Sequence, residues 1–196
     1  MIILFIMSYK YTQNWFLVSE LSKTIYKFLD ASKQLDLLEI GTFEGLSTTF
    51  FADNFLNHQS STLDAVDPFL HINDNDHDKY LNNVENNFDY NISICNNKEK
   101  VSMYKLTSDK FFDTFKNNDK KYDFIYIDGC HSPDYIKRDM NNSFKKLKIN
   151  GIMWMDDYLG GHNNDIKNTM NEWVKNNIDN IEIIHSGYQL GLRRTK

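Results

Sequence analysis

The chain has 196 residues, a formal net charge of −5 and 14% aromatic residues. This length suits one domain with a substantial core, so we expect a single domain over residues 1–196. Lys and Arg are scattered and form no basic stripe, which argues against nucleic acid as the partner because phosphate contacts need clustered cations. Cys95 and Cys130 have no metal-finger spacing, so we expect two free thiols in a reducing cytoplasm.

The N-terminal part of the chain is expected to lead into the core. Its first seven residues, MIILFIM, are apolar but too short to span a bilayer, and no other stretch is long enough, so we expect no membrane partner. The same apolar segment can pair subunits in a homodimer, and either Met1 or Met7 can be the natural start. Apolar residues then recur at helical spacing from about Asn14 to Asp30, which predicts a helix within a lead-in of residues 1–34.

Short apolar runs and longer amphipathic stretches alternate through the remaining chain, which we expect to form the core of the domain over residues 35–196. The runs predict strands at 35–40, 62–67, 101–106, 122–128 and 151–156. The stretches between them predict helices near 46–57, 79–89, 109–117, 134–147 and 164–177. Such alternation is typical of an α/β fold whose parallel sheet carries helices on both faces.

The C-terminal runs IEIIH and YQLGL flank Ser186 and Gly187, which predicts an antiparallel hairpin. The expected sheet is therefore seven-stranded and mostly parallel. In such sheets the ligand lies beyond the carboxyl ends of the parallel strands, where the strand order reverses.

The loop after the first predicted strand, in LLEIGTFEGLS, combines glycines with acidic residues. Gly41 and Gly45 suit a ligand lying close to the backbone, but the spacing is not that of a dinucleotide loop. Glu39 and Glu44 would repel a pyrophosphate and instead suit a cation such as an amino group or a sulfonium. The alternative is a plain tight turn in which Glu44 is an anion at the start of a helix.

The next two strand ends carry further polar candidates. Asp67 lies where an acid typically binds a ribose diol, although it also suits a turn before Pro68. Phe69 could close over a purine. Ser108 or Asp109 is expected to cap the following helix, and the same residues could face an adenine edge.

These motifs together resemble the class I S-adenosylmethionine-dependent methyltransferases. LLEIGTFEGLS is similar to their first motif, VDPF to their second and YDFIYIDG to their fourth, over roughly Leu35 to the C-terminal hairpin. The resemblance implies a Rossmann-like methyltransferase fold and S-adenosylmethionine as cofactor. The expected cofactor-binding residues are Glu39, Gly41, Thr42, Glu44, Gly45, Asp67, Phe69, Ser108, Asp109 and Asp128.

Three carboxylates follow the fourth and fifth predicted strands, namely Asp128, Asp156 and Asp157. Gathered near a bound cofactor they are costly unless a cation neutralises them, and oxygen ligands favour Mg²⁺. IDGC and DDY are similar to the metal motifs of Mg²⁺-dependent O-methyltransferases of sugars and phenols, which implies all three as metal ligands. A metal-free site is the alternative, with Asp128 on the substrate and Asp156 as a cap.

This sequence departs from the family's pattern at Cys130. Related enzymes have a second acid there, which is a proposed base. A thiol among acids is a weak substitute because its pKa is raised. His131 is therefore the expected general base, with Asp128 beside it as the other catalytic residue. His131 could instead cap the helix beginning at Ser132 or merely pack beside Asp128.

The predicted function is transfer of a methyl group from S-adenosylmethionine to a hydroxyl of a small molecule, with a sugar or glycan precursor first and a phenol second. One alternative is a non-catalytic protein that binds adenosylmethionine. The other is an N-methyltransferase, which usually has an Asn/Asp-Pro-Pro-aromatic motif, whereas DPF occurs here on a different strand.

Overall fold

The structure, a computed structural model, describes residues 8–70, 83–160 and 164–196. The apolar start and the first part of the helix predicted at 79–89 lie outside the described residues. Within the described ranges, no helix is long and apolar enough to cross a membrane.

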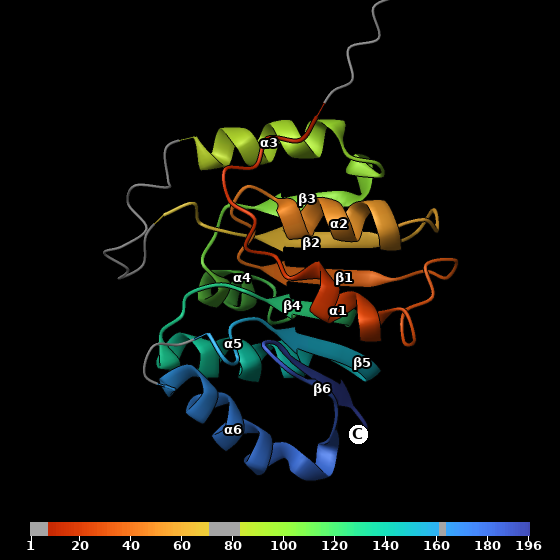
Figure 1. Cartoon of the computed structure of the whole chain (residues 1–196). Helices are drawn as coiled ribbons and strands as arrows, with labels where there is room; N and C mark the ends of the chain where they lie inside the picture. The colour runs from red at the N-terminus through yellow and green to blue at the C-terminus, as the bar shows by residue number, and fades with distance from the viewer. Residues whose placement is uncertain (1–7, 71–82, 161–163) are drawn as a thin grey trace, which may run out of the picture.

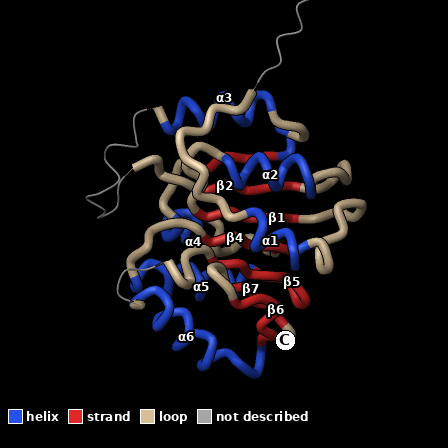
Figure 2. The backbone as a smooth tube through the Cα atoms, viewed as in Figure 1, coloured by secondary structure: helices blue, strands red, loops and turns tan. Residues whose placement is uncertain are grey.

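Strands and helices alternate through the described chain (Figures 1 and 2). The strands are β1 (Asp36–Ile40), β2 (Thr62–Val66), β3 (Val101–Tyr104), β4 (Tyr122–Ile127), β5 (Leu147–Met155), β6 (Ile181–Ser186) and β7 (Leu190–Arg194). The α-helices are α1 (Val18–Ile25), α2 (Leu46–Phe55), α3 (Val84–Ile94), α4 (Ser108–Thr114), α5 (Pro133–Lys146) and α6 (Asp165–Asn177), and 3₁₀ turns η2 (Lys98–Lys100) and η3 (Ile178–Asn180) precede β3 and β6.

The seven strands form one sheet in the order β3-β2-β1-β4-β5-β7-β6. Strands β1 to β5 pair in parallel, and β7 runs antiparallel to both β5 and β6. The predicted α/β class and the mostly parallel sheet with its antiparallel hairpin are confirmed. The order reverses between β1 and β4, which places a ligand cleft at their carboxyl ends.

The sheet separates two apolar cores because successive residues of a strand point to opposite faces. On β4, Phe124 and Tyr126 belong to the core under α1 and α2, whereas Ile125 and Ile127 belong to the core under α4, α5 and α6. Figure 1 shows α1 and α2 on one side of the strands and α4 and α5 on the other. Since alternate residues share a face, Asp128 leaves β4 on the side of Tyr126.

Three predicted elements have boundaries that are wrong by four residues or more. The helix predicted near 79–89 continues to Ile94. The helix predicted from Asn14 to Asp30 is only Val18–Ile25, because the residues before it extend along the cleft and Trp15 packs on Phe43 with ring centroids 4.9 Å apart. Strand β5 begins at Leu147 rather than at residue 151, since Leu147 already pairs with Tyr122 before a register shift.

Candidate active site

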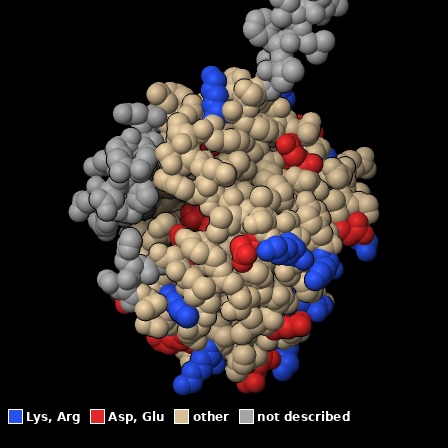
Figure 3. All heavy atoms as spheres, in the orientation of Figure 1, with Lys and Arg blue, Asp and Glu red and all other residues tan. Residues whose placement is uncertain are grey.

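A cleft of about 970 Å³ opens at the carboxyl ends of the parallel strands. Its described lining contains no Lys or Arg and one histidine. Figure 3 shows acidic atoms inside a hollow on this face. Such a wall attracts cations and repels phosphates. The acidic residues of the lining are Glu44, Asp67, Asp128, Asp139, Asp156, Asp157 and Asp165.

The loop between β1 and α2 is held against the end of β4. Gly41 has φ of +83°, and a Cβ there would lie 1.9 Å from the carbonyl oxygen of Asp128. The backbone N–H of Asp128 in turn donates to Ile40 O at 2.8 Å. This position therefore requires glycine, for its conformation and for the close backbone contact.

Glu39 ends up beneath the loop rather than in the cleft lining. The side chain is fully buried, and one oxygen accepts a hydrogen bond from the Ser47 hydroxyl. The other oxygen, Oε2, has no hydrogen-bond partner in the described part of the chain. Burial, reinforced by the charges of Asp128 and Asp67, raises the pKa of Glu39 to about 8. A nearby cation would therefore stabilise its carboxylate form.

Glu44 lines the cleft, and its carboxylate binds both the N-terminal segment and α3. One oxygen accepts from the backbone N–H of Thr12 at 2.5 Å, and the other accepts from Asn87 Nδ2 on α3 at 2.7 Å. The buried amide of Asn91 also donates to the Glu44 carbonyl oxygen at 2.8 Å. The glutamate thus anchors the N-terminal segment over the loop.

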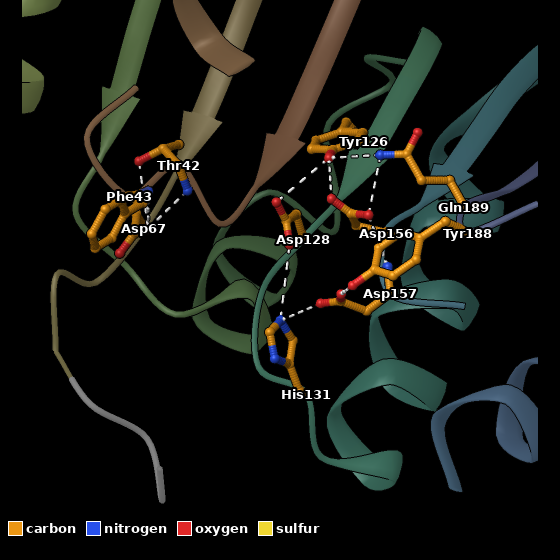
Figure 4. A network of polar contacts seen from close by, with 10 residues as sticks. All are labelled: Thr42, Phe43, Asp67, Tyr126, Asp128, His131, Asp156, Asp157, Tyr188 and Gln189. Carbon is orange, nitrogen blue, oxygen red and sulfur yellow. Dashed lines mark hydrogen bonds and ion pairs between the residues drawn. The ribbon is translucent and has the colours of Figure 1, made fainter. Parts of the chain in front are cut away.

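Asp67, at the end of β2, binds the same loop from the other side (Figure 4). Its Oδ2 accepts from the backbone N–H groups of Thr42 at 2.8 Å and Phe43 at 3.1 Å, and its Oδ1 from that of Phe69 at 2.7 Å. Burial raises its pKa. The Thr42 hydroxyl also donates to Oδ2 at 3.4 Å, whereas Oδ1 accepts one bond among the described residues and so has a lone pair open to a ribose hydroxyl. The Phe69 ring packs against Phe88, with centroids 5.5 Å apart.

The structure separates the two residues predicted at the adenine edge. Ser108 lines the cleft, whereas Asp109 accepts from Arg138 Nε at 3.1 Å and is absent from the lining. The prediction that one of them caps α4 is wrong. The cap is Thr107, one residue earlier, whose hydroxyl oxygen accepts from the backbone N–H of Lys110 at 3.3 Å.

At the other end of the cleft His131 lies between two carboxylates (Figure 4). Its Nε2 is 2.9 Å from Asp157 Oδ2 and 3.9 Å from Asp128 Oδ1. These carboxylates, Asp128 first, raise the pKa of His131 to about 11, so the imidazolium form prevails at neutral pH. Residue 131 does not cap α5, because the cap position is Ser132.

A buried polar network that the sequence analysis missed supports these acids. Tyr126 donates from its hydroxyl to Asp156 Oδ2 at 2.7 Å and to Asp128 Oδ2 at 3.5 Å. Gln189 Nε2 donates to Asp156 Oδ1 at 3.1 Å, while Trp154 Nε1 donates to Gln189 Oε1 at 2.9 Å. The sequence held one signal, because Tyr126 and Asp128 are two residues apart and share a face of β4.

The end of the cleft that holds Asp128, Asp156 and Asp157 offers ligand groups for a divalent cation. Among the described residues, Asp128, His131 and Asp157 each offer a ligand atom, and these atoms lie within 4.8 Å of one another. Asp156 lies outside this group, and both of its oxygens already accept hydrogen bonds. Burial, with the charge of Asp128 next, raises its pKa to about 7. The predicted metal ligands, Asp128, Asp156 and Asp157, stay a prediction.

Comparison with known proteins decides the class. A family model described as a methyltransferase domain matches residues 38–158, which include the glycine loop and all three acidic strand ends. The chain belongs to this methyltransferase family. No curated protein sequence matches the methyltransferase.

Solved structures agree on the fold of this methyltransferase. The O-methyltransferase TomG from Streptomyces achromogenes, in complex with SAM, has a TM-score of 0.62 and 14% identity over 82% of this chain and 73% of TomG. A candidate rRNA methylase from Clostridium thermocellum has a TM-score of 0.64 and 14% identity over 88% and 92% of the two chains. MycE, in complex with Mg and SAH, has a TM-score of 0.58 and 14% identity over 85% of this chain and 46% of MycE.

The predicted class, a class I S-adenosylmethionine-dependent methyltransferase, is confirmed, as is its Rossmann-like fold. The roles of individual residues and the nature of the acceptor stay predictions. The described cleft brings together ten of the predicted site residues, namely Gly41, Thr42, Glu44, Asp67, Phe69, Ser108, Asp128, His131, Asp156 and Asp157. Glu39, Gly45 and Asp109 lie outside its lining.

Proposed function

We propose that this methyltransferase transfers the methyl group of S-adenosylmethionine to a hydroxyl of a small molecule, with a sugar or glycan precursor first and a phenol second. The observation that carries the proposal is the cleft itself, whose described lining is rich in carboxylates and holds no Lys or Arg. A sulfonium with an ammonium group offsets that negative charge. A pyrophosphate would increase it.

The contacts in the cleft suggest one direction for the cofactor. Its amino-acid end would lie along the loop from Gly41 to Gly45, above buried Glu39, and its ribose at Asp67. The adenine would then lie toward Ser108 and the turn after β4. This order leaves the methyl group facing Asp128 and His131.

Catalysis in this proposal needs alignment, removal of a proton and exclusion of water, because the sulfonium methyl is already electrophilic. His131 would take the hydroxyl proton of the acceptor as the methyl arrives. In the present arrangement its two carboxylate partners favour the protonated ring. His131 can therefore act as a base only when Asp128 and Asp157 are engaged by other groups.

Asp128 and Asp157 would hold a divalent cation, which would engage their charges and leave the ring nitrogen of His131 free to take the proton. A bound cation of this kind lowers the pKa of a coordinated hydroxyl and fixes its oxygen. Tyr126 and Gln189 would keep Asp156 below the ligands and thereby set the position of the segment that carries Asp157. Mg is present with SAH and mycinamycin VI in one structure of MycE, which supports a cation here.

The relatives favour a small-molecule acceptor over nucleic acid. TomG and NovP are described as O-methyltransferases, TomG in tomaymycin synthesis. A candidate rRNA methylase shares the fold, but an acidic cleft would repel the phosphates of RNA.

A turnover assay tests the proposal. The protein is incubated with S-adenosylmethionine and panels of sugars and phenols, with and without Mg²⁺, and adenosylhomocysteine is measured. We expect turnover with at least one hydroxylated acceptor. His131→Ala should lower turnover by about 10²-fold or more, since general base catalysis contributes about 10²–10⁴-fold, while its cofactor affinity stays level. His58→Ala, at a loop histidine outside the cleft, is the matched control.

Each alternative gives a different result. Equal turnover in wild type and His131→Ala would remove the base assignment, and insensitivity to EDTA would remove the cation. Cofactor binding with no turnover on any acceptor would favour a non-catalytic binding protein. Turnover restricted to amines would favour an N-methyltransferase.

A further inference from the structure

One buried carboxylate of the cleft has no role in the function proposed above. Asp139, on the second turn of α5, is 2% exposed and belongs to the cleft lining. Its Oδ1 has no hydrogen-bond partner among the residues that the structure describes. A buried acceptor without a donor is rare in folded proteins, and a ligand that carries an N–H group is one explanation for it.

The neighbours of Asp139 place it between the ends of β3 and β4. A Cβ built on Gly129 would lie 3.8 Å from Asp139 Oδ2, so the carboxylate is directly beside the turn that follows β4. Ser108, the first residue of α4, lies on its other side and lowers its pKa by hydrogen bonding. Ser108 and Gly129 also line the cleft. The carboxylate therefore lies where the cofactor's adenine is placed in the proposed function.

No neighbouring cation satisfies this carboxylate among the described contacts. Arg138, the preceding residue, turns to the surface, where its guanidinium pairs with Asp109 and lies over the Tyr135 ring at 4.2 Å. Burial raises the pKa of Asp139 to about 6. The charge of Arg138 lowers this pKa, but it is the weakest of the influences on it. Asp139 is thus an anion at neutral pH with one oxygen still to be paired.

We propose that Asp139, rather than Asp109, recognises the adenine of the cofactor by accepting a hydrogen bond from its 6-amino group. The inference rests on the proposed function, since it requires the cofactor in the cleft with its ribose at Asp67. The 6-amino group is a neutral N–H donor at the edge of a flat ring, and Gly129, which lines the cleft, lies beside the carboxylate that would accept from it. A 6-oxo base would set its oxygen against the carboxylate, and the site would reject it.

Binding of two cofactor analogues tests the assignment. S-adenosylhomocysteine carries the 6-amino group and S-inosylhomocysteine carries an oxygen in its place. We expect wild-type protein to bind the adenosyl form at least about tenfold more tightly in calorimetry, as a charge-assisted hydrogen bond implies. Asp139→Asn should bind the two forms within about threefold of each other, because an amide can accept from the amino group or donate to the oxygen.

The control is Asp134→Asn, the same change at an exposed position of the same helix, which should keep the wild-type preference. A wild type that binds adenosylhomocysteine without preference over the inosyl form would overturn the role of Asp139 and leave the proposed function standing. If Asp109→Asn removes the preference and Asp139→Asn does not, the role of Asp139 is likewise overturned and the proposed function still stands. Wild type that binds neither compound would overturn the cofactor placement, and the inference with it.

Discussion

At the scale of single residues, the protonation state of buried Glu39 should change when the cofactor binds. Its pKa is raised to about 8, so at pH 7 the side chain is mostly protonated in the cofactor-free protein. A bound sulfonium or ammonium would stabilise the carboxylate and lower that pKa. We therefore predict that S-adenosylmethionine binding at pH 7 releases part of a proton, seen in calorimetry as a binding enthalpy that depends on the ionisation enthalpy of the buffer.

Glu39→Gln isolates this contribution because it keeps the shape and cannot titrate. The variant should lose most of the buffer dependence. An enthalpy that is independent of buffer in the wild type would contradict the prediction.

At the scale of elements, the Asn91 side chain on α3 binds both the N-terminal segment and the loop between β1 and α2, in addition to the bonds made by Glu44. Buried Asn91 accepts from the backbone N–H of Lys10 at 2.7 Å and donates to the carbonyl oxygens of Lys10 and Glu44, both at 2.8 Å. We predict that Asn91→Ala lowers the free energy of unfolding by about 2–4 kcal/mol, because it leaves buried backbone groups unpaired. Urea unfolding measures this change.

The same variant should raise amide hydrogen exchange in the segment that precedes α1 and weaken cofactor binding, since Gln13 to Leu17 line the cleft. Asn86→Ala, at an exposed position of α3, is the matched control and should change neither property. Unchanged exchange in Asn91→Ala would mean that the segment is held by other contacts.

The elements also show what the sequence could predict. The alternation of strands and helices, the hairpin and the acids at the strand ends follow from the sequence pattern, since each buried run ends where its polar residues begin. The partners of those acids do not follow. The sequence offered Glu44 as an acid near a cation or as an anion at a helix start, and nothing set Asp139 apart from the other polar residues of the amphipathic α5. Their burial depends on the N-terminal segment and on the turn after β4, which pack against them from distant parts of the chain.

At the scale of the whole molecule, the acids gathered at one sheet edge should make stability depend on pH. Glu39 and Asp139 are two of these acids that lie away from Asp128, Asp156 and Asp157. Burial is the main cause that raises their pKa values, to about 8 for Glu39 and about 6 for Asp139. Acids raised in this way favour the folded state below their unfolded values, near 4, and lose that contribution as the pH rises through the folded values. The cofactor-free protein should therefore be less stable at pH 8 than at pH 5.5.

We expect the free energy of unfolding in urea to fall by more than about 2 kcal/mol over this interval, since each pKa unit corresponds to about 1.4 kcal/mol. Glu39→Gln and Asp139→Asn should each be more stable than the wild type at pH 8 and nearly equal to it at pH 4.5. The double variant should have the flattest profile of all. A wild type whose stability rises from pH 5.5 to 8 would show that cations outside the described cleft already neutralise these acids, and the electrostatic basis for sulfonium binding would be lost with it.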